Sequence, residues 1–406
     1  MSRSPVPPRI LFVANDPPGR AVYRYRCENF ADILRGAGWS ADVVYVGDRH
    51  VRVDHDIVAL HRICANAEGR AYGRAARACG ATLVYGADDL VFDSPTELSA
   101  SPSYADKRRR HYAALHARMA RDADAVLVST EFLAQRARAL TGGTKPVRVV
   151  RNFLSRELLE ISDRAALSRP QRESGPPRRV TLGYLSGTPT HDADLASIAG
   201  PLADALRAFP NAELLLVGPV QLPSGFTSGL PPVRIRRAPF VPWRDLPGIL
   251  ATVDINLAPL DLANVFNHAK SAIKLLEAGA VGVPTVASAT AGFREAVAGS
   301  PPAGFLAADA DDWRRLLSEL LGSVEARRVA GDAARAFVRS TGAADAARAF
   351  VRSTGAADAC RDTVRETFDQ LLELPRPRPV HPAATHVGSW FAPKHLAKSV
   401  LRRLGR

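Results

Sequence analysis

Short apolar runs alternate with longer amphipathic stretches along roughly the first 150 residues. Each run has the length and the Val, Ile and Leu content of a buried strand, and helices are predicted near residues 28–37, 105–120 and 130–140. Strands that alternate with helices in this way form parallel sheets, so the pattern predicts a doubly wound α/β domain. The predicted strands are residues 9–14, 41–46, 56–61, 81–86 and 125–129, with a closing strand in VRVVRNF at 147–153.

The alternating pattern lapses after residue 153, and the chain becomes rich in Pro, Arg, Ser and Gly, which places a domain boundary near 165–178. A second series follows, with strands predicted at 180–186, 212–218, 233–239, 255–260 and 284–288 and helices at 195–209, at 243–251 and from 267. We therefore expect two Rossmann-like domains, 1–165 and 179–345, with a linker at 166–178, a helical segment at 346–374 and a Pro-rich, basic tail at 375–406.

The stretch NHAKSAIKLLEAGAVGVP (267–284) reads as a helix that is apolar almost all the way round. At roughly 100° per residue, Lys270, Lys274 and Glu277 fall on one stripe of this helix, and Asn267 or Ser271 can cap its start. A charged line at the start of a buried helix suggests a nearby anion. An intrahelical Lys274–Glu277 pair, with Lys270 in solvent, explains the same pattern without a ligand.

A second segment, GYLSGTPTHDADL (183–195), lies between a predicted strand and a predicted helix. Gly183, Ser186 and Gly187 allow a tight turn with exposed amides, and the N-terminus of the helix adds positive partial charge. Such a loop suits a diphosphate. Gly and Ser in a strand-to-helix loop also occur simply as turn residues, and this alternative stays open.

Residues 332–344 and 345–357 are identical copies of DAARAFVRSTGAA. Thirteen residues rotate a continuous helix by about 220° net, so Phe337 and Phe350 cannot face one core from one straight helix. The duplication is expected to lengthen a peripheral segment and is assigned no chemistry. Residues 389–406 are predicted to form a basic amphipathic helix that rests on an anionic membrane surface, with a disordered basic tail as the alternative.

The composition is that of a soluble globular protein, with 46% apolar and 23% charged residues. Residues 375–406 hold seven Lys and Arg and no Asp or Glu, more than half of the net charge of +13, and no nucleic-acid motif is visible, so no nucleic-acid partner is expected. No apolar run is long enough for a signal or a membrane span, which predicts a cytoplasmic protein, peripheral at the inner face of the membrane. Four cysteines without CxxC spacing indicate reduced thiols rather than disulfides or zinc.

The order of these motifs closely resembles that of GT-B fold glycosyltransferases, specifically retaining, family 4-like enzymes of the glycosyltransferase group 1 type. GYLSGTPTHDADL, ELLLVG, FVPWRDLPGILATVDINLAPL and FNHAKSAIKLLEAGAVGVPTVAS follow one another as in the nucleotide-sugar domain of that family. ILFVANDPPGRAVYRYR, LVYGADDLVFD and ADAVLVSTEFLAQRA look like its acceptor domain. The resemblance covers roughly residues 9–370 and implies two Rossmann-like domains that face a central cleft.

The resemblance implies a nucleoside-diphosphate sugar as co-substrate, with no metal or other cofactor. Lys270 would stabilise the diphosphate as the glycosidic bond breaks, Glu277 would hold the ribose hydroxyls, Lys274 would orient Glu277 or touch phosphate, and His191 would approach the donor. The implied donor-binding set is Gly183, Ser186, Gly187, Thr188, Asn267, Lys270, Ser271, Lys274 and Glu277. Many relatives carry another glutamate at the position of Ala269, so the usual contact to the sugar is missing, and Asn267 and His268 are the candidate substitutes.

On the acceptor side, Asp88 and Asp89 follow a predicted strand at the cleft edge, where relatives often carry a His-Asp pair. We expect sugar or acceptor hydrogen bonds there rather than a structural turn, and no metal, because consecutive residues on one strand point apart. His61, also at a strand end, is interpreted as a structural histidine. Gly19, Arg20, Arg24 and Arg26 lie in or just after the first loop, where the arginines are either phosphate ligands or a solvated helix start.

The resemblance implies a retaining transferase that moves a sugar to a hydroxyl of a glycan or lipid-linked acceptor in cell-surface glycan or glycolipid biosynthesis. Lys270, Asp88 and His191 would be its catalytic residues, and the departing phosphate would accept the proton of the hydroxyl. The basic run KRRRH (107–111) favours a lipid-linked or cell-surface acceptor, and a solvated charge run explains it nearly as well. The alternatives are a catalytically weakened scaffold, for which Ala269 argues, and an NDP-sugar epimerase.

Overall fold

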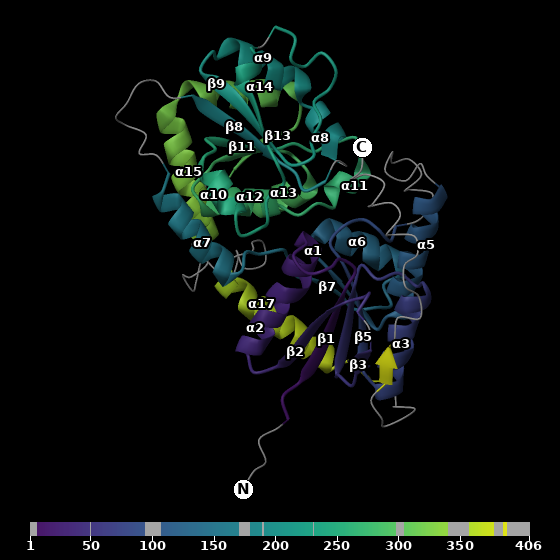
Figure 1. The fold of residues 1–406 in the computed structure, drawn as a ribbon. Coiled ribbons are helices and arrows are strands. Elements are labelled where there is room, and N and C mark those ends of the chain that lie inside the picture. The colour runs from purple at the N-terminus through teal and green to yellow at the C-terminus, as the bar shows by residue number, and fades with distance from the viewer. Residues whose placement is uncertain are drawn as a thin grey trace.

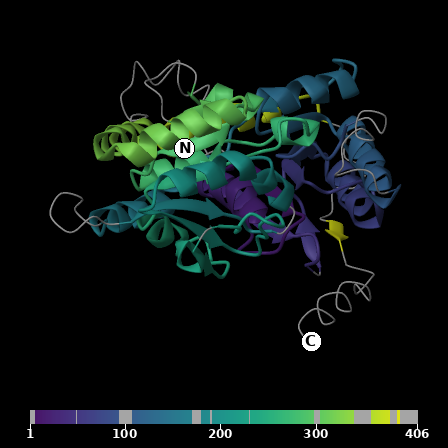
Figure 2. The ribbon, with the colours of Figure 1, turned by 90° about the horizontal axis from the view of Figure 1, so that it is seen from above.

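The computed structural model describes residues 6–48, 50–93, 107–169, 179–188, 191–229, 231–297, 304–339, 357–376 and 385–387. Within these residues, two six-stranded sheets form the centres of two α/β domains, which lie one above the other in Figure 1. Seen from above, the second domain covers part of the first (Figure 2). The predicted fold class is confirmed.

The first sheet is parallel, with strand order β2-β1-β4-β5-β6-β7. Every residue of β4 and β5 is buried, as expected for central strands of a parallel sheet that is covered on both faces. The strands are β1 (Arg9–Ala14), β2 (Ser40–Tyr45), β4 (Ile57–His61), β5 (Thr82–Ala87), β6 (Ala125–Val128) and β7 (Val147–Val149). The helices of this part of the chain are α1 (Ala21–Tyr23), the π-helical turn η1 (Arg24–Glu28), α2 (Asn29–Gly36), α3 (Ala67–Cys79), α5 (Lys107–Asp122), α6 (Glu131–Leu140) and α7 (Arg156–Leu167).

The second sheet is also parallel, with strand order β10-β9-β8-β11-β12-β13. Its strands are β8 (Val180–Leu185), β9 (Ala212–Val217), β10 (Ile235–Ala238), β11 (Ile255–Ala258), β12 (Thr285–Ser288) and β13 (Phe305–Ala307). Its helices are α8 (Asp192–Ala196), α9 (Ala199–Ala208), α10 (Leu246–Ala251), α11 (Val265–His268), α12 (Ile273–Ala280), α13 (Ala291–Val297), α14 (Ala310–Gly322) and α15 (Val324–Arg339), with a short 3-10 turn η4 (Pro232–Arg234). The helix predicted over 195–209 is thus two helices.

The C-terminal part of the chain returns to the first domain. Helix α17 (Ala357–Leu372) lies beside α2 in Figure 1, and the Phe368 ring packs 5.6 Å, centroid to centroid, from Phe12 of β1. Strand β14 (Thr385–Val387) pairs antiparallel with β3 (Val51–Val53), inside the segment interpreted as a Pro-rich linker and tail. Helix α17 and strand β14, the last two elements in the described part of the chain, therefore complete the first domain rather than extend from the second.

Several predictions concern residues outside the described ranges. The first copy of the duplicated segment begins in α15, where Phe337 is buried, whereas the second copy up to residue 356 and the predicted tail helix at 389–406 are outside the described residues. Among the helices that the structure describes, none is long and apolar enough to cross a bilayer.

Candidate active site

Asp88 and Asp89 follow β5, where the carboxyl ends of the first sheet's strands meet. His61, the last residue of β4, is opposite Gly86 in the register, and its Nε2 is 3.1 Å from Asp88 Oδ1. A Cβ on Gly86 would stand 2.5 Å from His61 Nδ1, so glycine is needed for this close approach. Burial lowers the pKa of His61 to about 4 although Asp88 opposes the shift, so the ring is neutral at physiological pH. The interpretation of His61 as a hydrogen-bonded, buried histidine is confirmed.

Arg62 binds both carboxylates at once. Its Nε donates to Asp88 Oδ1 at 2.5 Å, and a terminal nitrogen of the guanidinium donates to Asp89 Oδ2. The backbone of Arg62 has φ of 54°, a strained conformation for a residue other than glycine. The prediction that Asp88 and Asp89 point apart along a strand is wrong, because β5 ends at Ala87 and both carboxylates reach one guanidinium. Burial favours the neutral acid, yet Arg62 and His61 hold the pKa of Asp88 well below its usual range.

Lys270 reaches this acidic pair from the second domain. Helices α11 and α12 are separate, and Lys270 lies in the turn between them, so the prediction of one continuous helix with three charges on one stripe is wrong. Lys270 Nζ is 3.0 Å from Asp89 Oδ1 and 4.8 Å from the centroid of the Phe266 ring. Gly292 of α13 packs against this turn, and a Cβ there would stand 2.1 Å from the carbonyl oxygen of Lys270. Helix α13 therefore packs tightly against the turn that carries Lys270.

The predicted caps of this helix are also wrong. The side chain of Asn264 caps α11, and α12 follows Ala272 without any side-chain cap. The Oγ atom of Ser271 accepts a hydrogen bond of 2.9 Å from Asn152 Nδ2 in the first domain. The Nδ2 atom of Asn267 donates to Asp194 and to a backbone carbonyl in the loop after β11. Both side chains therefore tie the turn around Lys270 to its surroundings.

Glu277 and Lys274 do share α12, but no ion pair joins their side chains within the described residues. The hydroxyl of Tyr25, from η1 in the first domain, donates to Glu277 Oε1 at 2.5 Å. Lys274 Nζ lies 4.8 Å from the centroid of the Tyr184 ring in β8. Burial raises the pKa of Glu277 to about 7 although the Tyr25 bond opposes the shift, and burial lowers the pKa of Lys274 to about 8. The intrahelical ion pair that would explain the pattern without a ligand is therefore not formed.

The predicted diphosphate loop is shorter than expected. Gly183 lies inside β8, where a Cβ would stand 2.6 Å from a methyl group of Val253, so it is a packing residue and not a loop residue. The Oγ atom of Ser186 donates to the carbonyl oxygen of Thr188 at 2.9 Å and so closes the turn that contains Gly187. The following helix α8 has only five residues, with two aspartates in its first turn. These two carboxylates already neutralise the positive partial charge at the N-terminus of α8, so the structure does not support the predicted anion site there.

Asp194 is a buried acid that the sequence reasoning missed. Its carboxylate accepts hydrogen bonds from His191 Nδ1 at 2.9 Å and from Asn267 Nδ2 at 2.7 Å. It thereby connects two predicted donor residues that are 76 positions apart in the chain. The His-x-x-Asp spacing directly after the loop was the available signal.

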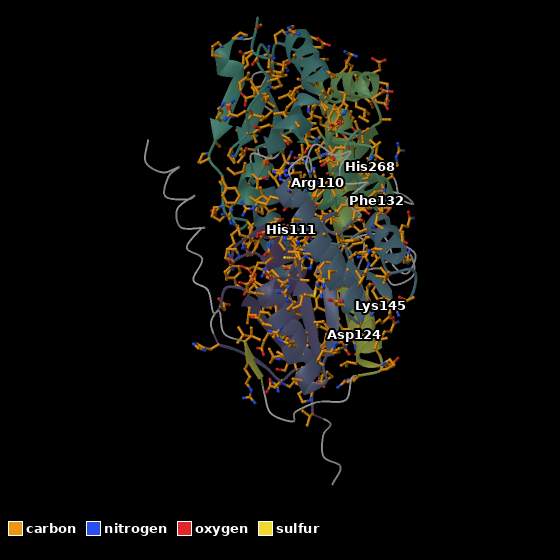
Figure 3. All side chains as sticks on the ribbon, turned by 90° about the vertical axis from the view of Figure 1, so that its right-hand side faces the viewer. Arg110, His111, Asp124, Phe132, Lys145 and His268 are labelled. Atoms are coloured by element: carbon orange, nitrogen blue, oxygen red, sulfur yellow. The ribbon has the colours of Figure 1, made fainter. Side chains whose placement is uncertain are left out.

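The two candidate substitutes for the missing glutamate, Asn267 and His268, both make hydrogen bonds to other residues of the protein. Asn267 donates to Asp194, and His268 Nε2 is 3.1 Å from the carbonyl oxygen of Leu262. The His268 ring also lies 6.0 Å from the Phe132 ring of α6, and Figure 3 shows the two residues near each other between the domains. Ala269 itself is fully buried in the apolar core of the first domain. Neither substitute gains support from this arrangement.

The first loop and η1 hold the predicted acceptor-side arginines differently. Gly19, with φ of 85°, and Arg20 are exposed at the end of the loop. Arg24 is buried, donates to Ser155 Oγ at 2.8 Å and lies over the Trp243 ring of the second domain. Arg26 is 1% exposed and donates to the carbonyl oxygen of Val150 at 2.6 Å. The interpretation of Arg24 and Arg26 as a solvated helix start is therefore wrong. The exposed Arg20 fits either interpretation, a phosphate ligand or a solvated helix start.

These side chains converge where the two domains meet, and comparisons with known proteins define the class. Residues 191–323 match the family model described as glycosyl transferases group 1. No curated protein matches the sequence. The solved structure of sucrose-phosphate synthase from Thermosynechococcus elongatus has a TM-score of 0.61 at 14% identity, over 91% of this chain and 100% of that chain.

Two further structures agree with this result. A glycosyltransferase from Rickettsia africae has a TM-score of 0.60 at 12% identity, over 91% of this chain and 100% of that chain. HepE from Anabaena, solved in complex with UDP-glucose, has a TM-score of 0.54 at 15% identity, over 89% of this chain and 99% of that chain. The architecture is thus the two-domain GT-B fold. The match over residues 191–323 indicates a group 1 glycosyltransferase domain, and the chain is a glycosyltransferase.

Proposed function

We propose that the protein is a retaining glycosyltransferase that moves a sugar from a nucleoside diphosphate to a hydroxyl group of a glycan or lipid-linked acceptor. The observation that carries this proposal is the contact of Lys270 with Asp89. The contact places a second-domain lysine, near Lys274 and Glu277 in the chain, directly against the polar strand ends of the first domain. A donor held by the second domain would then present its sugar to groups of the first domain.

The leaving group is a nucleoside diphosphate, which gains negative charge as the glycosidic bond breaks. Lys270 stands beside the uncapped start of α12, so its ammonium group and the first amides of that helix can stabilise this charge together. The two lysines of this region supply positive charge from the protein itself. We propose that transfer needs no metal ion for this reason.

Asp88 and His61 of the first domain are poor bases, which supports the retaining mechanism. Asp88 is held as a carboxylate by Arg62 and His61, and its pKa lies well below the usual range although burial favours the neutral acid. A carboxylate with so low a pKa accepts protons weakly. The incoming hydroxyl would therefore lose its proton to the departing phosphate on the same face of the sugar.

The test is a panel of nucleoside diphosphates and their sugar conjugates, measured by thermal shift and calorimetry with and without EDTA. UDP and UDP-glucose come first, because HepE was solved with UDP-glucose. We expect one nucleotide to bind selectively and equally well with EDTA, and the anomeric proton in NMR spectra of the product to show the configuration of the donor. If no nucleotide binds, the catalytically weakened scaffold becomes the better function, and an inverted product would exclude the retaining mechanism.

The acceptor is proposed to lie at an anionic membrane surface. Lys107, Arg108 and Arg109 are exposed at the start of α5, on the first domain, and residues 389–406 add a basic segment outside the described residues. Removing residues 389–406 should lower co-sedimentation with vesicles that contain anionic lipid and leave nucleotide affinity unchanged, because each basic residue near such a surface contributes about 1 kcal/mol of attraction. Neutral vesicles are the control. Equal binding of both forms to anionic vesicles would exclude the membrane role of the tail.

A further inference from the structure

The His191–Asp194–Asn267 cluster holds a buried carboxylate that no predicted role explains. We propose that Asp194 is a positioning residue of the donor site, which fixes the imidazole of His191 in one tautomer and holds the turn that leads to Lys270. This inference rests on the proposed function, because it assigns His191 to the donor side of the same site. Asp194 itself is not expected to touch the substrate.

The hydrogen bonds that the Asp194 carboxylate accepts all come from residues outside α8. Its Oδ2 atom accepts from His191 Nδ1 at 2.9 Å, and its Oδ1 atom accepts from Asn267 Nδ2 at 2.7 Å and from the backbone N–H of Asp261 at 3.0 Å. An acid in the first turn of a helix commonly stabilises that helix through its dipole. Here the carboxylate instead joins α8 to α11 and to the loop after β11, although it is only 5% exposed. Burying a charge in this way is costly unless it is fully hydrogen-bonded, as it is here.

The carboxylate determines which nitrogen of His191 carries the proton. Asp194 can only accept, so Nδ1 of a neutral His191 must be the protonated nitrogen. Nε2, on the far side of the ring, has no hydrogen-bond partner among the described residues, and the side chain is 23% exposed. Nε2 is therefore available to accept a hydroxyl of the donor sugar.

The neighbours of His191 place it beside the other donor groups. The Tyr184 hydroxyl donates to the carbonyl oxygen of His191 at 3.2 Å, and Lys274 Nζ lies over the ring of the same tyrosine at 4.8 Å from its centroid. On the other side, Asp194 holds Asn267, three residues before Lys270. One buried carboxylate thus positions a histidine and the turn that carries a lysine.

Asp194→Asn tests the role because it keeps the size of the side chain but offers only one acceptor oxygen. That oxygen can keep the two bonds of Oδ1, and the new amide then faces His191 Nδ1 as a donor, which favours the Nε2–H tautomer. Asp192→Asn is the matched control, since Asp192 is in the same turn and, among the residues that the structure describes, its carboxylate accepts only from the backbone N–H of Gln221 at the surface.

The tautomer is read by NMR of protein labelled with ¹⁵N-histidine, in which His191→Ala assigns the signal. We expect the Nδ1–H form in the wild type and in Asp192→Asn, and the Nε2–H form in Asp194→Asn. This measurement needs no donor and is made on the full chain. A His191 signal that averages both tautomers in the wild type, or that is unchanged in Asp194→Asn, would overturn the proposal.

The kinetic readout is the release of nucleoside diphosphate from the sugar conjugate, UDP-glucose first, with water as acceptor. If the fold stays intact, Asp194→Asn should lower kcat about 10²-fold, whereas KM should change less than about threefold. The reason is that the wrong tautomer of His191 slows the reaction of the bound donor but does not weaken nucleotide binding. The double variant with His191→Ala should lose no more than the more damaged single variant. If Asp194 were merely structural, Asp194→Asn would instead raise KM and lower thermal stability together. If the wild type bound no nucleotide, the proposed function would fail, and the NMR result would still decide the positioning.

Discussion

Replacing Lys270 with alanine should lower the kcat of sugar transfer by about 10²–10³-fold, the cost typical of removing one preorganised group that stabilises developing negative charge. Lys270 Nζ lies at the contact of the two domains, 3.0 Å from Asp89, and the lysine side chain is 24% exposed. A bound diphosphate would share or replace this carboxylate contact, so the lysine would act mainly when the leaving group becomes charged. The loss should therefore appear in kcat more than in the affinity for the donor.

The fold should tolerate this substitution. Asp89 keeps its contact with Arg62 when Lys270 is removed, so the carboxylate is not left without a partner. We expect the free energy of unfolding to fall by about 1 kcal/mol or less, as for a partly exposed ion pair. Calorimetric unfolding and steady-state kinetics check the two expectations separately. Lys145→Ala is the control, because Lys145 belongs to the first domain and lies well away from His268 in Figure 3. A Lys270→Ala variant with the turnover of the wild type would rule out this role.

Glu277→Ala should weaken nucleotide binding by about 10–100-fold. Each hydrogen bond to a charged group contributes about 1.5–3 kcal/mol, and about 1.4 kcal/mol corresponds to one factor of ten in affinity. The gain from the ribose hydroxyls is reduced because Tyr25 already donates to Glu277 Oε1 in this structure, which puts the expected loss below the sum of two such bonds. Isothermal calorimetry with the nucleotide selected by the panel measures the effect. Wild-type affinity in the variant would remove Glu277 from the donor site.

The same carboxylate should make nucleotide affinity depend on pH. Burial raises the pKa of Glu277 to about 7, so the group is protonated below that pH and becomes a full acceptor above it. Burial also lowers the pKa of Lys274 to about 8, so its charge is lost above that value. Affinity should therefore rise from pH 6 toward a maximum between about 7 and 8 and then fall. In Glu277→Gln the phosphates and Lys274 still titrate, so the rise in affinity should become smaller while the fall above about pH 8 stays. An unchanged rise in this variant would assign the pH dependence to another group.

Three of the predicted donor-site residues form hydrogen bonds or an ion pair with residues of the first domain, and the predicted roles did not include these contacts. Tyr25 holds Glu277, Asp89 holds Lys270, and Asn152 holds Ser271, each from the first domain to the second. A donor that uses Glu277 and Lys270 must share or displace these partners. Nucleotide binding and the contact between the domains are therefore expected to depend on each other.

The pattern of apolar runs was sufficient to predict the two parallel sheets and the α/β class of the fold. A strand that is buried on both faces is apolar along most of its length, so the strands β1, β4, β5, β8, β9 and β11 are visible without any tertiary information. The position of Lys274 and Glu277 on one helix followed from the helical period. Motif order then indicated the GT-B fold, which the family model and the solved structures confirm.

Tertiary structure alone decided the rest, because it depends on partners that are distant in sequence. The break between α11 and α12 is stabilised by Asn152, Asp194 and the close packing of Gly292, and none of these lies within the helical stretch itself. Local periodicity therefore predicted one helix where long-range hydrogen bonds favour two. The return of α17 to the first domain has the same cause, since the rings of Phe12, Phe30 and Trp39 that receive Phe368 lie more than 300 residues earlier in the chain. Residue types indicated the chemistry of the site, and only the packing of the two domains decided which charges meet.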